Sequence, residues 1–155
     1  MMNKQSRRQL LKNGGLLGLV AAIGSALTPR LAFAAWNKAA FESKSLADTY
    51  KAMSAEGATA SADVQILASD IAENGAVVPV QILSKIANTT QISLLVEKNP
   101  TMLAASFEVS PEMLADVTTR IKMGQTSNVI ALVKAGGKFF TATKEIKVTL
   151  GGCGG

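Results

Sequence analysis

Residues 78–96 read VPVQILSKIANTTQISLLV, and this stretch decides the fold. It holds two runs in which apolar side chains recur at every second position: Val78, Val80 and Ile82, then Ile92, Leu94 and Val96. Successive side chains of a β-strand point to opposite faces, so this period of two predicts strands with one buried face. Asn88, between the runs, favours a turn. The stretch therefore predicts two strands separated by a turn.

The same period extends the prediction in both directions along the chain. Val64 and Ile66 precede the stretch, and Ile146, Val148 and Leu150 lie near the C-terminus. Residues 129–133 are apolar at every position, which is typical of a central strand. Turn residues separate these runs at Glu73-Asn74-Gly75, at Asn99-Pro100 and at Ala135-Gly136-Gly137-Lys138, and the last of these predicts a hairpin. Pro79 has no amide proton to donate, so its strand is expected to be an edge strand or to be bulged there.

One helix is predicted before the strands, from Ala35 to about Met53. Leu46, Tyr50 and Met53 have the spacing of one helix face, and Gly57 follows the pattern. Short strands about ten residues apart with few helices predict a mainly β fold, an immunoglobulin-like antiparallel β-sandwich with an N-terminal helix. A small β-barrel is the alternative architecture. The predicted domain covers residues 35–150.

The N-terminal residues have the features of a signal for export. Arg7 and Arg8 stand in the basic stretch SRRQLLK and resemble a twin-arginine signal. The apolar run that follows covers residues 14–27, shorter than the roughly 20 residues of a membrane-spanning helix. Ala32 and Ala34 form a small-residue pattern that suits cleavage before Ala35. We therefore expect a cleaved signal at residues 1–34, no membrane anchor, and a mature protein exported folded to the periplasm.

Removal of the signal changes the charge of the chain. Of its 16 lysines and arginines, five lie in residues 1–34, together with none of the 11 acidic residues. The mature chain would then hold 11 basic and 11 acidic residues, scattered along its length. A nucleic-acid-binding surface needs clustered lysine and arginine, so the sequence argues against a nucleic-acid partner.

Conventional catalytic groups are scarce in this sequence. It contains no histidine and one cysteine. Ser-His-Asp or Cys-His catalysis and histidine or cysteine metal sites are therefore not expected. The closely spaced carboxylates Asp70 and Glu73, and Glu112 and Asp116, have spacings that solvated surface residues also show. No glycine-rich phosphate loop precedes a lysine and a helix. The sequence predicts neither catalytic residues nor a metal or cofactor of its own.

The C-terminal segment GGCGG is the strongest candidate for a functional site. Gly151, Gly152, Gly154 and Gly155 flank Cys153 with the residue type that has the greatest backbone freedom. Cysteine is usually buried, and a lone exposed thiol in an exported protein signals intermolecular pairing or reactivity. We expect residues 151–155 to form a flexible arm that presents the thiol of Cys153 to other proteins.

Several segments carry a resemblance to a known family. They are GGCGG at 151–155, KEIKVTL at 144–150, TRIK at 119–122, NVIA at 128–131, ENG at 73–75 and VPV at 78–80. With these segments the chain resembles the SoxY family, the sulfur-compound carrier subunits of the periplasmic thiosulfate-oxidising (Sox) system. Residues 98–113 hold nothing distinctive of that family.

The resemblance implies a β-sandwich that pairs with the companion subunit SoxZ. It further implies that the c-type cytochrome complex SoxAX joins thiosulfate to the thiol of Cys153, and that the manganese hydrolase SoxB releases sulfate. A molybdenum and haem sulfane dehydrogenase follows in systems that contain one, and all metal centres belong to these partners. Gly151, Gly152, Gly154 and Gly155 correspond to the family's arm, and exposed apolar residues on one sheet are expected to form the partner interface.

Two other functions stay open at the level of sequence. The terminal Gly154-Gly155 is similar to the C-terminus of ubiquitin-like sulfur carriers, which are activated at the C-terminal carboxylate. In that case Gly155, and not Cys153, would be the attachment site. The other alternative is an exported structural or adhesion sandwich in which Cys153 crosslinks two copies. Replacement of Cys153 by serine distinguishes these functions, since only activation at Gly155 would survive it.

Overall fold

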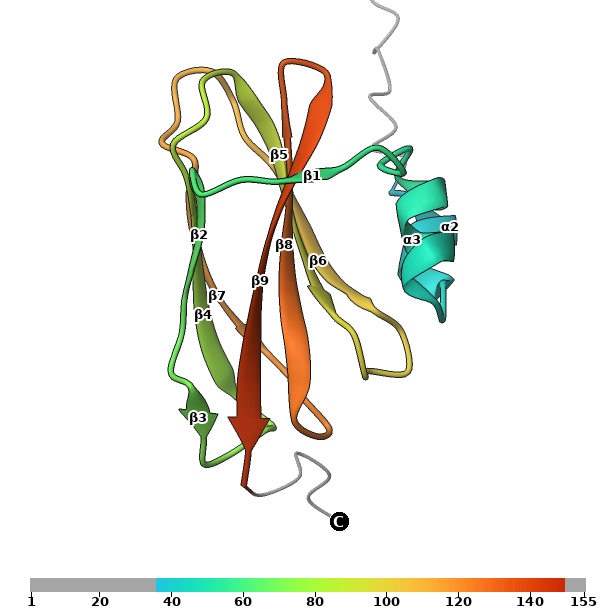
Figure 1. Ribbon diagram of the computed structural model, residues 1–155, viewed down its shortest axis with the longest axis vertical. Coiled ribbons are helices and arrows are strands. Elements are labelled where there is room, and N and C mark those ends of the chain that lie inside the picture. Colours follow the sequence, from blue (N-terminus) through green and yellow to red (C-terminus); the bar gives the residue numbers. More distant parts are fainter. Residues whose placement is uncertain (1–35, 150–155) are drawn as a thin grey trace, which may run out of the picture. The chain divides into compact units, whose positions relative to one another are not determined.

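The computed structural model describes residues 36–149, which form two short helices followed by nine strands (Figure 1). The helices are α2 (Lys38–Glu42) and α3 (Leu46–Ala52). The strands are β1 (Thr59–Ala60), β2 (Val64–Leu67), β3 (Ile71–Ala72), β4 (Val78–Ser84), β5 (Thr89–Val96), β6 (Leu103–Glu108), β7 (Asp116–Ile121), β8 (Ser127–Ala135) and β9 (Lys138–Val148).

The strands form two sheets that pack face to face. The larger sheet has the order β1-β9-β8-β5-β6, with β3 also paired to β9, and the smaller has the order β2-β4-β7. In Figure 1 the smaller sheet lies to the left of the larger one. Pairing is antiparallel except at β1 and β3, which both run parallel to β9. The predicted β-sandwich is confirmed.

The main core lies between the sheets, and the residues that decided the fold contribute to it. Val78, Val80 and Ile82 of β4 are each 1% exposed, while the residues between them are half-buried or exposed. Ile92 and Leu94 of β5 are fully buried in the same apolar cluster. The predicted central strand at residues 129–133 is also confirmed, because it is part of β8, between β5 and β9.

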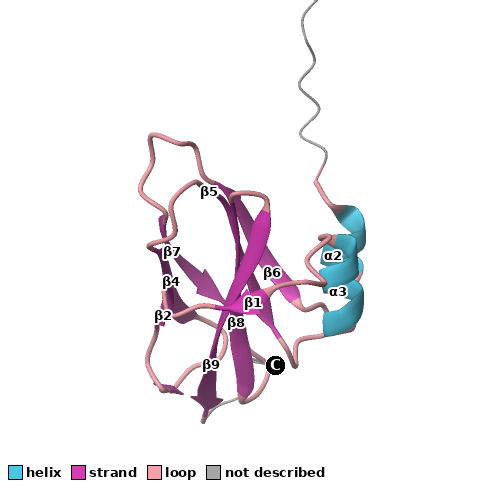
Figure 2. Cartoon of the chain, turned by 45° about the horizontal axis from the view of Figure 1, so that its top comes forward, coloured by secondary structure: helices cyan, strands magenta, loops and turns pink. Residues whose placement is uncertain are grey.

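A second apolar cluster lies on the opposite face of the larger sheet. Leu95, Leu103, Ile130 and Leu132 of this sheet pack there with residues of the helical segment, including the fully buried Ala40. Figure 2 shows the two helices beside β6. The helices therefore cover part of this face, where strand side chains that point away from the main core are buried.

The prediction of a single N-terminal helix over residues 35–53 was wrong, because the helical segment is divided in two. Ser43 has extended backbone angles, and its hydroxyl donates a hydrogen bond of 2.6 Å to the carbonyl of Ala40 at the end of α2. Ser45 then begins α3, since its side-chain oxygen accepts a hydrogen bond of 3.1 Å from the amide of Asp48. Serine competes for backbone groups in this way at helix ends.

The prediction that Pro79 lies in an edge strand or at a bulge was wrong. β4 is the central strand of its sheet, and its register with β7 runs without a shift through Pro79, opposite Arg120. On its other side, β2 ends at Leu67, opposite Gln81. Pro79 therefore lies in a part of β4 that has a neighbouring strand on one side only. Proline is tolerated there because no ladder on the open side needs its missing donor.

The predicted turns at residues 73–75, 88, 99–100 and 135–138 all connect successive strands. Gly136 and Gly137 connect β8 and β9 in a hairpin, with φ angles of +56° and +76° that side chains disfavour. Asn74 closes the turn before β4, because its side-chain oxygen accepts a hydrogen bond of 2.8 Å from the amide of Ala76. Strand β6, in contrast, was not predicted from the sequence, because residues 103–108 lack a clear apolar period of two.

Removal of a large core side chain should destabilise the sandwich strongly. Leu94 is fully buried between the sheets, and we expect Leu94→Ala to lower the free energy of unfolding by about 2–5 kcal/mol, through lost burial and the cavity left behind. Urea denaturation followed by circular dichroism measures this change. The control Leu114→Ala removes a side chain that is 87% exposed, and should change the free energy by less than about 0.5 kcal/mol.

Candidate functional site

The predicted attachment site and signal lie outside the described residues. This applies to Cys153, to the glycines around it, and to Arg7, Arg8, Ala32 and Ala34. The structure does describe the residues that directly precede the C-terminal segment. They are the end of β9 and Thr149, the last described residue.

Strand β3 holds one edge of β9 up to the last described residue. The amide of Lys147 donates a hydrogen bond of 2.9 Å to the carbonyl of Asp70, and the amide of Thr149 donates one of 3.1 Å to the carbonyl of Ala72. These two bonds belong to the short parallel pairing of β3 with β9. On the other edge, the amide of Val148 donates a hydrogen bond of 3.0 Å to the hydroxyl of Thr126. Residues 147–149 are therefore bonded alternately on the two edges.

An ion pair fastens the segment that leads into β3. Lys144 of β9 lies 2.9 Å from a carboxylate oxygen of Asp70 and donates a hydrogen bond of 2.6 Å to the carbonyl of Ala68. The hydrogen bond and the charge of Lys144 lower the pKa of Asp70 below its usual value. The Asp70 side chain is 86% exposed, so this pair gains little energy from its charges alone. Its effect is to keep residues 68–70 against β9.

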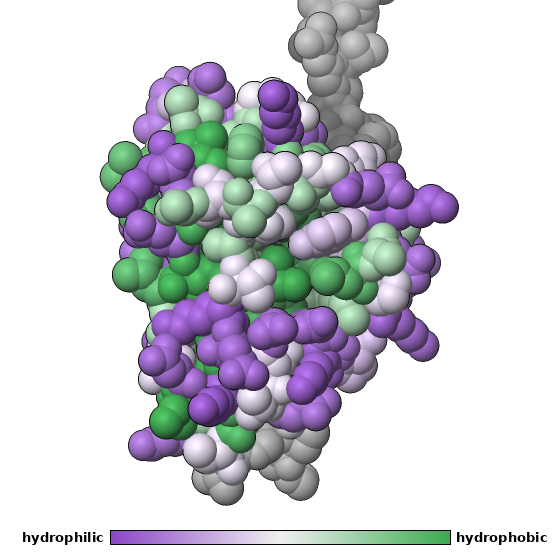
Figure 3. Space-filling model, viewed as in Figure 1, coloured by the Kyte–Doolittle hydropathy of each residue, from purple (hydrophilic) through white to green (hydrophobic). Residues whose placement is uncertain are grey.

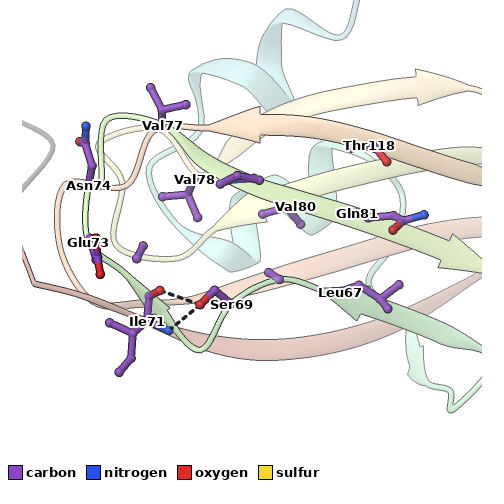
Figure 4. A pocket seen from close by; sticks show the side chains of 13 residues that line it. Leu67, Ser69, Ile71, Glu73, Asn74, Val77, Val78, Val80, Gln81 and Thr118 are labelled. Carbon is purple, nitrogen blue, oxygen red and sulfur yellow. Dashed lines mark hydrogen bonds between the residues drawn. The ribbon is translucent and has the colours of Figure 1, made fainter.

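A groove of about 470 Å³ lies beside β3, on the side of β4 that β2 leaves open (Figure 4). Ala72, which accepts the hydrogen bond from Thr149, is among its lining residues. The groove therefore begins beside Thr149, the last described residue. It is lined by Leu67, Ala68, Ser69, Ile71, Ala72, Glu73, Asn74, Val77, Val78, Pro79, Val80, Gln81 and Thr118.

Three large apolar side chains of this groove are exposed to solvent. Leu67 is 49% exposed, Ile71 53% and Val77 51%. Hydrophobic surface is visible over β2 and near the end of the sandwich that carries β3 (Figure 3). Glu73 is the one charged residue among those that line the groove. The groove thus offers mainly apolar contacts to a molecule that approaches this end of the sandwich.

Sequence reasoning did not single out these exposed side chains, although a signal exists for two of them. Leu67 breaks the alternation of Val64 and Ile66, because it is apolar at the next, odd position. Val77 breaks the alternation of Val78 and Val80 in the same way. In a strand with a period of two, an apolar residue out of phase points to the other face. Ile71 has no such signal, because β3 is two residues long.

Two of the four carboxylates considered as catalytic candidates have structural partners. Asp70 pairs with Lys144, and Asp116 of β7 accepts two hydrogen bonds, of 2.8 and 2.9 Å, from the side-chain amide of Gln81. Within residues 36–149, no three side chains of histidine, cysteine, aspartate or glutamate gather in a way that could hold a metal ion.

The chain matches proteins of one family in both sequence and structure. The sequence model of the family described as sulfur oxidation protein SoxY matches residues 50–153. The solved structure of the sulfur carrier protein SoxY from Chlorobium limicola f thiosulfatophilum is 39% identical to the chain, with a TM-score of 0.61. That similarity covers 70% of this chain and 96% of the other. The chain is therefore a β-sandwich protein of sulfur oxidation. It belongs to the SoxY family.

A more distant likeness concerns the fold alone. The superoxide reductase (neelaredoxin) from Ignicoccus hospitalis is 20% identical, with a TM-score of 0.50. This likeness covers 55% of the chain and 79% of the reductase. No curated protein sequence matches the chain.

Neither α2 nor α3 is long and apolar enough to cross a bilayer.

Loss of the ion pair should loosen the end of β9. In Asp70→Asn, Lys144 keeps an uncharged partner, and we expect faster hydrogen exchange at the amides of Lys147 and Thr149, corrected for intrinsic rates. The control Glu145→Gln removes a carboxylate from the same strand, leaves the pair intact, and should change neither amide. Equal exchange in both variants would show that β3 stays in place without the pair.

The same ion pair predicts a dependence on pH. The pKa of Asp70 is lowered in the folded protein, so the stabilisation is present at neutral pH and is lost as pH falls through the folded pKa, below the usual value of 3.8. Exchange at Lys147 and Thr149 in the wild type should approach that of Asp70→Asn in this acidic range. A constant ratio between the two proteins at all pH values would contradict this expectation.

Proposed function

We propose that this protein is an exported carrier that holds thiosulfate-derived sulfur intermediates on the thiol of Cys153 and presents them to enzymes. The observation that supports this most is the position of the only cysteine, four residues beyond Thr149, where the chain is still hydrogen-bonded to the sandwich. Membership of the SoxY family and the likeness to a sulfur carrier protein support the same function.

The proposed chemistry begins with formation of a sulfur–sulfur bond. The outer sulfur of thiosulfate bonds to Sγ of Cys153, the thiol proton passes to water, and two electrons pass to the haems of a c-type cytochrome complex of the SoxAX kind. The product is a cysteine S-thiosulfonate. Water then attacks the sulfonate sulfur in a manganese hydrolase of the SoxB kind, which releases sulfate and a proton and leaves a persulfide on Cys153.

In this scheme the chain supplies attachment and presentation, and its partners supply the redox and metal centres. An ordinary cysteine thiol has a pKa of about 8.5, so only a small fraction is thiolate at neutral pH. Activation of the sulfur is therefore assigned to the enzyme that receives the C-terminal segment. The companion subunit is of the SoxZ kind, the site of action is the periplasm, and residues 1–34 are the twin-arginine signal. A sulfane dehydrogenase would act on the persulfide where one is present.

Replacement of the cysteine tests the proposal directly. In a reconstituted system of carrier, companion subunit, cytochrome complex and hydrolase, Cys153→Ser should abolish thiosulfate-dependent sulfate release, because serine forms no bond to thiosulfate sulfur under these conditions. Sulfate is measured by ion chromatography. Ser110→Ala, which alters an exposed side chain between β6 and β7, should keep wild-type activity. Undiminished activity in Cys153→Ser would instead favour activation at Gly155.

The glycines around the cysteine should matter for delivery and not for stability. Gly152→Val and Gly154→Val restrict the backbone beside the thiol and add bulk that a narrow active-site channel must admit. We expect sulfate release to slow by about tenfold or more, an effect of about 1.4 kcal/mol or more on the barrier, while the urea midpoint stays unchanged. Equal turnover of the variants and the wild type would contradict the idea of an arm.

A further inference from the structure

We infer that the groove beside β3, with its exposed side chains Leu67, Ile71 and Val77, is the docking surface for the enzymes that act on Cys153. This inference rests on the proposed function. The occupant is an enzyme with apolar residues around the entrance to its active site. Three features of the molecule support it: the place where the described chain ends, the reach of the residues beyond that place, and the chemistry of the groove.

The length of the C-terminal segment limits how far from the sandwich an enzyme can bind. The amide of Thr149 is hydrogen-bonded to Ala72, and Cys153 is four residues further on. Four residues span at most about 14 Å, whatever path they take. Because an active site that reaches Sγ lies inside the body of an enzyme, the surface of that enzyme must meet the sandwich close to Thr149.

Even a small interface between the enzyme and the carrier is wide enough to include part of the groove. Transient protein complexes bury less than about 1,200 Å² in total, or about 600 Å² on each partner, which corresponds to a disc with a radius of roughly 14 Å. Ala72 is both the partner of Thr149 and a lining residue of the groove. An enzyme placed over the end of β9 therefore covers at least the part of the groove next to β3.

We expect the enzyme to contact side chains of the groove and not to add a strand to the open edge of β4. The open side of β4 begins beyond Gln81, where β2 ends, and Pro79 lies in this open part. Proline cannot donate to a ladder, so an added strand would find this edge interrupted. Recognition must then use the apolar groups of Leu67, Ile71 and Val77, each about half exposed.

Such a surface suits a carrier that visits several enzymes. Apolar contact is non-directional, so different enzymes can use the same groove without a shared hydrogen-bond pattern. Glu73 is the one charged lining residue, and few interactions in the groove would select a single partner. A small apolar surface of this kind gives weak and short-lived complexes. The carrier can then leave each enzyme after reaction.

The test uses the carrier with its companion subunit and a thiosulfonate already loaded on Cys153. The variant combines Leu67→Ser, Ile71→Ser and Val77→Ser, and the enzyme is the manganese hydrolase. The control combines Met113→Ser and Leu114→Ser, which are 62% and 87% exposed in the β6–β7 loop, at the opposite end of the sandwich from β3 (Figure 1). We expect the KM for the carrier to rise about tenfold in the groove variant, with kcat nearly unchanged, and both to stay unchanged in the control.

Two further measurements separate this inference from other uses of the groove. The variant should retain its companion subunit during gel filtration, and its free Cys153 should react with iodoacetamide at the wild-type rate. Loss of the companion subunit would assign the groove to that interface, and a changed alkylation rate would assign it to the C-terminal segment. Either result, or an unchanged KM, overturns the inference. Failure to load any thiosulfonate would contradict the proposed function itself.

Discussion

The hydrogen-bonded pairing of β9 is the interaction on which the rest of this structure depends. β9 pairs along its length with β8, and on its other edge it receives the short parallel strands β1 and β3. It thus connects the central strand of the larger sheet with the segment that crosses over to the smaller one. Since β9 is also the last strand before GGCGG, the same pairing fixes the starting point of the segment that carries Cys153.

Most of the architecture could be predicted from side-chain periodicity. The alternation around Val80 and Ile92, the continuous apolar run at 129–133 and the Gly136-Gly137 hairpin each reflect a local rule that packing in the sandwich also obeys. Two features that do not follow from periodicity were missed. Ser43 and Ser45 divide the helix through side-chain hydrogen bonds, and strand order determines that Pro79 lies in a central strand beyond the end of its neighbour.

The functional site could be predicted only in part. The composition of GGCGG was sufficient to single out Cys153, because a lone cysteine among glycines contradicts the usual burial of this residue type. That prediction lies outside the described residues. The sequence did not reveal how the site is supported. The pairing of Asp70 with Lys144 joins residues far apart in the chain, and the groove exists because β2 ends early, which only the register of the sheet determines.

The central claim is that sulfur intermediates are held on Cys153. Mass spectrometry of the intact protein and its C-terminal peptide tests it most directly, on material isolated without reductant from its native cells grown with thiosulfate. The account predicts thiosulfonate or polysulfide adducts that are confined to the peptide containing Cys153 and removed by reductant. A thiol that is always free, or found only as a disulfide between two copies, would contradict it and would favour a crosslinked structural domain.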